Sequence, residues 1–91
     1  MSAPLTDEEI EDRLPPEWEY VDDEIVRSYD FNDYLAGVAF ASEIADLADE
    51  AFHHPTIVIE YDTVEVRFTS HEAGGVTEQD LELAAECDAI R

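Results

Sequence analysis

The chain has 91 residues and a formal net charge of -21 at pH 7, because 25 acidic residues outnumber four basic ones, all of them arginine. So acidic a chain lacks the clustered basic side chains that binding to nucleic acid or to an anionic membrane requires. Its 45% hydrophobic content and regular apolar spacing argue against global disorder. The length suits one compact domain over residues 1–91, and oligomerisation would help so small a core.

The charge also predicts a salt-rich setting. Like charges repel one another, and salt screens this repulsion beyond about 10 Å at 0.1 M and about 3 Å at 1 M. The only cysteine, Cys87, cannot form an internal disulfide, and no signal peptide or long apolar run opens the sequence. No basic residue precedes Arg91 near Cys87, so a reactive thiolate is not expected. We therefore expect a cytoplasmic protein of a halophile.

The first predicted elements are a short helix and a pair of strands. Thr6 and Glu9 have the spacing of a capping box, which predicts a helix over about residues 7–14 that two prolines then end. Residues 18–31 carry apolar side chains on both sides of Asp22-Asp23. This pattern predicts two strands joined by a tight turn.

A long helix is predicted over residues 32–52, where apolar side chains recur at helical spacing. They form two adjacent stripes that together span roughly 200°, twice the arc of about 100° with which a helix covers a core on one side. One stripe consists of Tyr34, Val38, Ala41, Ala45, Ala48 and Phe52, and the other of Phe40, Ile44 and Leu47. The excess should contact another element or a second subunit, and we favour a subunit interface.

The C-terminal half predicts a hairpin and a last helix. Pro55 favours extended geometry at His54, so the long helix should end at or before that residue. Residues 56–61 and 63–70 are predicted to form a hairpin with one solvent-exposed face and one face in the core. After a loop with two glycines, a final helix is expected over about residues 77–90. The predicted fold class is α+β, in the order αββαββα.

All three histidines lie in one short span of the chain, and histidine exchanges protons near neutral pH because its ordinary pKa is about 6.5. If the fold closes this span, the histidines become one site for proton transfer. The residues of the pattern are Asp49, His53, His54, Pro55, Tyr61, His71 and Asp80.

This spacing resembles that of the pterin-4a-carbinolamine dehydratases, and the element order and length also suit that family. The resemblance implies a four-stranded antiparallel sheet with helices on one face, assembled as dimers or tetramers. It implies dehydration of a 4a-hydroxytetrahydropterin to the quinonoid dihydropterin, the step that recycles tetrahydrobiopterin after an aromatic amino acid hydroxylase. No metal or organic cofactor is implied.

The resemblance also implies roles for individual residues. His53 and His71 would transfer protons, and His54 would bind and orient the pterin and share the proton transfer. Asp80 would hold a histidine in one tautomer while it also caps the last helix. Asp49 and Tyr61 would help to orient the substrate. From the residues alone, Asp49 belongs to the polar face of the long helix, and Tyr61 to the core or the pocket wall.

Three other interpretations compete with this one. His53-His54 could be a solvated helix end, placed favourably near the helix dipole. The fold could serve a non-catalytic interaction or dimerisation protein. Three histidines and an aspartate could ligate zinc or iron, although adjacent histidines make poor chelators when their rings point apart. Many members of the resembled family carry a bulky residue soon after His-His-Pro, where this chain has Thr56-Ile57-Val58, so the exact pterin stays open.

Overall fold

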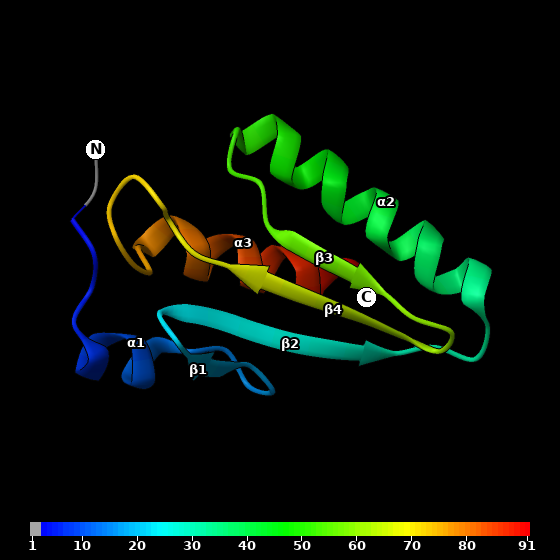
Figure 1. Ribbon diagram of the computed structural model, residues 1–91, viewed down its shortest axis with the longest axis horizontal. Helices are drawn as coiled ribbons and strands as arrows, with labels where there is room; N and C mark the ends of the chain where they lie inside the picture. Colours follow the sequence, from blue (N-terminus) through cyan, green and yellow to red (C-terminus); the bar gives the residue numbers. More distant parts are fainter. Residues whose placement is uncertain (1–2) are drawn as a thin grey trace.

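The elements follow the predicted order αββαββα in the computed structural model, which describes residues 3–91 (Figure 1). Their bounds differ from the predicted ones by a residue or two, which is the usual uncertainty of element ends. The elements in these residues are α1 (Asp7–Arg13), β1 (Glu19–Val21), β2 (Glu24–Asp30), α2 (Tyr34–Ala51), β3 (Thr56–Ile59), β4 (Thr63–Phe68) and α3 (Glu78–Ile90).

The four strands form one antiparallel sheet in the order β1-β2-β4-β3. Strands β2 and β4, which are far apart in the sequence, pair in its centre, with Tyr29 opposite Val64. Burial alternates along β4 as predicted, and its buried side chains are Val64, Val66 and Phe68. These side chains join residues of all three helices in one apolar core, so the helices cover one face of the sheet.

Local signals account for the ends of several elements. The Thr6 hydroxyl accepts from the Glu9 backbone N–H at 3.1 Å, and Glu9 Oε1 accepts from the Thr6 N–H at 2.9 Å, which confirms the capping box. Asp22 and Asp23 have φ of 52° and 64°, which is the left-handed pair that a tight hairpin turn needs between β1 and β2. The predicted turn is therefore confirmed.

Helix α2 packs closely against the sheet through Gly37, where an added Cβ would lie 3.1 Å from Val64. Its buried residues are Gly37, Phe40, Ala41, Ile44 and Ala48, which come from both predicted stripes. The outer side of the arc remains uncovered, with Tyr34 49% and Phe52 84% exposed. Within residues 3–91, no other element of the chain covers this side, so only part of the predicted arc serves the core.

A polar cluster that the sequence did not indicate ties α3 to the sheet. Asp88 accepts hydrogen bonds from Trp18 Nε1, Arg27 Nη1 and Tyr29 Oη, the last at 2.5 Å. Burial and this carboxylate together raise the pKa of Tyr29. Trp18 is 5% exposed and belongs to the apolar core. The cluster anchors the end of α3 opposite the histidines.

Cys87 lies in the core and should be inert. Its burial, with smaller effects from Asp88 and Glu86, raises the pKa of the thiol from 9.0 to about 12. We expect Ellman's reagent to label it far more slowly in the native protein than in urea at pH 8. Because the folded pKa is raised, the associated stability is complete below pH 9 and is lost as the pH rises toward about 12. Equal labelling rates in both states would contradict this placement.

Within residues 3–91, no helix is long and apolar enough to cross a membrane.

Candidate functional site

The end of α2 turns the histidine pair toward the sheet. Phe52 caps the helix in the left-handed conformation, with φ of 50°, and its N–H reaches the carbonyls of Ala48 and Asp49. The N–H of His53 also donates to the Ala48 carbonyl, at 3.0 Å. A residue in the left-handed conformation commonly ends a helix, and this residue is usually glycine. The helix thus ends before His54, as predicted, and the chain reverses just where the histidines begin.

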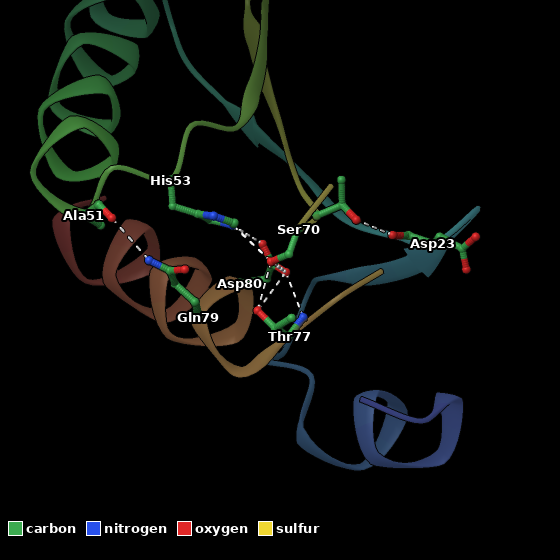
Figure 2. Close-up of polar contacts among 8 residues, drawn as sticks. Asp23, Ala51, His53, Ser70, Thr77, Gln79 and Asp80 are labelled. Atoms are coloured by element: carbon green, nitrogen blue, oxygen red, sulfur yellow. Dashed lines mark hydrogen bonds and ion pairs between the residues drawn. The ribbon is translucent and has the colours of Figure 1, made fainter. Parts of the chain in front are cut away.

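His53 and Asp80 form the inner part of the site (Figure 2). Nε2 of His53 lies 2.5 Å from Oδ1 of Asp80, at the start of α3. The Asp80 side chain is completely buried, whereas the His53 side chain keeps 14% of its surface exposed. The ring of Phe68 lies parallel to the imidazole, with centroids 6.3 Å apart. A carboxylate within hydrogen-bond distance of one ring nitrogen orients the imidazole and determines its tautomer.

Asp80 has two functions in the fold. Its Oδ2 accepts from the backbone N–H of Thr77 and from the hydroxyl of Ser70, both at 2.8 Å. The first contact caps α3, while Oδ1 contacts His53. The predicted coexistence of a capping role and a contact with histidine is therefore present in the structure.

His54 and Asp49 form a second, outer pair. Their Nε2 and Oδ1 atoms are 3.1 Å apart, and their side chains are 55% and 82% exposed. The ring of Phe52 meets His54 edge to face, with centroids 5.5 Å apart. Asp49 thus lies on the polar face of the long helix, as the residues alone predicted, and it reaches the histidine from there. Solvent screens this pair, so it orients His54 only weakly.

All three histidines border one pocket of about 690 Å³. A volume of about 300–1,000 Å³ is typical of small-molecule sites. His71 is exposed at the rim, where it also borders a smaller hollow beside the β1–β2 turn. The residues that line the main pocket are Phe52, His53, His54, Thr69, Ser70, His71, Glu72, Ala73, Thr77 and Gln79. The span that carries the histidines therefore closes into one site, as expected.

Tyr61 lies elsewhere. It is 75% exposed in the turn between β3 and β4 and does not border the pocket, so its placement in the core or the pocket wall was wrong for this chain. The reason is geometric. Strand β3 starts just after the histidines (Figure 1). Because a strand rises about 3.3 Å per residue, the β3–β4 turn that holds Tyr61 lies at the far end of β3 from them.

Several residues of the pocket were not predicted from the sequence. Ser70 and Thr77 contact Asp80, and Gln79 donates to the Ala51 carbonyl at 3.3 Å, which ties the start of α3 to the end of α2. Two signals in the sequence could have pointed to these residues: Ser70 is next to His71, and Thr77 lies at the predicted start of the last helix. Neither signal reveals that both hydroxyls converge on one carboxylate.

Among residues 3–91, no three side chains of the His, Cys, Asp and Glu types are grouped so that they could hold a metal ion. The three histidines border one pocket, but His53 pairs with Asp80 and His54 with Asp49, while His71 lies at the rim.

Comparisons with known proteins cover most or all of the chain. A family model described as "Pterin 4 alpha carbinolamine dehydratase" matches residues 3–90. A protein of Halobacterium salinarum named "Putative pterin-4-alpha-carbinolamine dehydratase" is 65% identical over 91 residues, which is all of both chains. A protein of Natronomonas pharaonis with the same name is 51% identical and covers 99% of this chain and 98% of its own length.

Two solved structures are also similar. The crystal structure of a "transcriptional coactivator/pterin dehydratase" from Brucella melitensis has a TM-score of 0.88 and 33% identity, and the match covers 96% of this chain and 97% of that one. A pterin dehydratase-like protein, described as a RuBisCO assembly factor in the α-carboxysome, has a TM-score of 0.63 and covers 79% and 83%. Its 23% identity makes it a likeness of fold alone.

Proposed function

Because the chain belongs to the pterin 4 alpha carbinolamine dehydratase family, we propose that it is a hydro-lyase that converts a 4a-hydroxytetrahydropterin to the quinonoid dihydropterin. Its cellular role would then be the recycling of tetrahydrobiopterin or of a related reduced pterin. The observation that carries this proposal is the His53–Asp80 pair, which opens on a pocket that His54 and His71 also border.

The proposed chemistry is an elimination of water. The bond from C4a to the hydroxyl oxygen breaks, and an acid protonates the departing oxygen, while a base takes the proton from N5 as the C4a=N5 bond forms. Each well-placed acid or base accelerates such a step by about 10²- to 10⁴-fold. We assign these proton transfers to His53 and His71, and the binding and orientation of the pterin chiefly to His54. Because loss of water exchanges no electrons with another molecule, the proposal requires no redox cofactor.

The direct test is the decay of enzymatically generated 4a-hydroxytetrahydropterin, followed by ultraviolet absorbance in high salt. The folded protein should accelerate this decay well above the uncatalysed rate. Heat-denatured protein and a Ser28→Ala variant serve as controls, since Ser28 is exposed on β2 away from the pocket and its variant should keep full activity. Failure of the folded protein to accelerate the decay would refute the proposed reaction for this pterin.

The alternative remains a non-catalytic interaction or dimerisation protein with the same fold. The Brucella relative is described as a transcriptional coactivator as well as a pterin dehydratase. What favours association is the uncovered side of α2, including Tyr34, Leu35 and Phe52. We propose that further copies of this chain cover it in a homodimer or homotetramer. If interaction were the whole function, replacing the histidines would leave association intact and no dehydration would be measured in the wild type.

We also propose that the protein works in a salt-rich cytoplasm, which the charge of -21 and the relatives from Halobacterium and Natronomonas support. Raising KCl from about 0.1 M to above 1 M should increase the thermal midpoint, because counterions screen the acidic surface. We expect at least about 4 °C, the shift that about 1 kcal/mol produces in a domain of this size. Sucrose at equal osmolality is the control, and equal midpoints at both salt concentrations would contradict the prediction.

A further inference from the structure

Two buried hydroxyl groups lie beneath the His53–Asp80 pair. Ser70 Oγ is 2.8 Å from Asp80 Oδ2 and 2.9 Å from Thr77 Oγ1, and both Ser70 and Thr77 are buried. Ser70 is the last residue before His71, and Thr77 is the N-cap residue of α3. The three side chains therefore come from two separate segments and meet only in the folded chain (Figure 2).

The directions of these hydrogen bonds follow from counting protons. A hydroxyl has one proton to donate, and Ser70 uses it on Asp80 Oδ2. The contact between the two hydroxyls can then form only if Thr77 donates to Ser70 Oγ. Oδ2 also accepts the backbone N–H of Thr77 at 2.8 Å. This oxygen is thus held by two donors at 2.8 Å, while the Thr77 hydroxyl lies farther from it, at 3.5 Å, and Asp80 presents Oδ1 to His53.

The tautomer of His53 follows from the same count. An ionised carboxylate only accepts hydrogen bonds, so the 2.5 Å contact requires a proton on Nε2 of His53. A neutral imidazole carries only one N–H proton, so Nδ1 carries none. Because Nε2 faces a completely buried carboxylate, the nitrogen free to exchange a proton is Nδ1.

We propose that Ser70, supported by Thr77, is a positioning residue that acts through Asp80 to hold neutral His53 as the Nε2–H tautomer, so that His53 exchanges protons with its substrate through Nδ1. The catalytic half of this statement rests on the proposed function. The tautomer and its dependence on Ser70 do not, because they concern the free protein.

The first test is ¹⁵N–¹H correlation NMR of the imidazole rings in the free protein, in high salt and above the pH at which His53 loses its charge. We expect one His53 tautomer, with the proton on Nε2. Ser70→Ala should give a mixture of both tautomers, and Ser70→Thr, which keeps the hydroxyl, should restore the single form. Ser28→Ala is the matched control and should resemble the wild type.

Kinetics supply the second test. Ser70→Ala should lower kcat by about tenfold, the effect of about one charge-assisted hydrogen bond, with KM nearly unchanged. Ser70→Thr should recover most of the loss. A wild-type spectrum with the proton on Nδ1 would overturn the proposal without any variant. If Ser70→Ala leaves both the tautomer and kcat unchanged, Ser70 does not position His53. A wild type with the Nε2 proton but no dehydration would instead refute the proposed function alone.

Discussion

His53→Ala should lower kcat for dehydration by about 10²- to 10⁴-fold, the contribution of a general acid or base, with a smaller change in KM. The imidazole lies against buried Asp80 and parallel to Phe68, so its position is determined by the core before the substrate arrives. Alanine removes the proton-transfer group and the contact to Asp80 Oδ1, while Asp80 keeps its hydrogen bonds from Ser70 and Thr77. Steady-state rates with 4a-hydroxytetrahydropterin in high salt measure both constants.

His54→Ala is the matched comparison, because His54 borders the same pocket but is largely exposed and pairs only with exposed Asp49. Its replacement should raise KM more than it lowers kcat, as expected of a residue that binds and orients the pterin. The His53→Ala result would be contradicted by a kcat within twofold of the wild type in a folded protein. Equal losses of kcat in both variants would instead mean that the two histidines share the proton transfer.

Asp80→Ala should lower the free energy of unfolding by about 2–6 kcal/mol, because two buried donors, the Ser70 hydroxyl and the Thr77 N–H, lose their acceptor at about 1–3 kcal/mol each. Ser70 and Thr77 would lose their acceptor, and His53 would lose the group that orients it. Since domains of this size are stable by only about 5–15 kcal/mol, the variant would be close to unfolding. Urea unfolding in 2 M KCl measures the loss.

Asp49→Ala is the control for this prediction, since it makes the same chemical change at a side chain that is 82% exposed. It should change the free energy of unfolding by no more than about 0.5 kcal/mol. Asp80→Asn keeps the shape of the side chain but replaces one acceptor oxygen with a donor, so its loss should fall between those of the two alanine variants. A loss below about 1 kcal/mol in Asp80→Ala would contradict the buried hydrogen bonds of Asp80 with Ser70, Thr77 and His53.

Local signals were sufficient for the elements themselves. The capping box of Thr6 and Glu9 and the proline after His54 act within a few residues, and the structure has the corresponding helix start and helix end. Alternation along β4 likewise reports which side chains are buried, because successive residues of a strand point to opposite faces. The element order could therefore be predicted without any knowledge of which strands pair.

The width of the apolar arc on α2 did not indicate which part of the helix faces the sheet. The sequence indicated too many apolar side chains for one face, and the structure buries Phe40 and Ala41 but leaves Tyr34 and Phe52 exposed. Which part of the arc meets the sheet depends on the rotation of the helix about its axis. That rotation is determined by close contacts such as Gly37 against Val64, which no local pattern encodes.

The sequence by itself determined the residue types that carry the proposed chemistry, the order of the elements and the acidic surface, because each of these is local or additive along the chain. Only the tertiary structure decided that β2 lies beside β4, that Tyr61 is far from the histidines, and that Ser70 and Thr77 meet at Asp80. These features depend on pairing between distant segments. Their stability comes from burial and from hydrogen bonds that exist only once the chain has closed on itself.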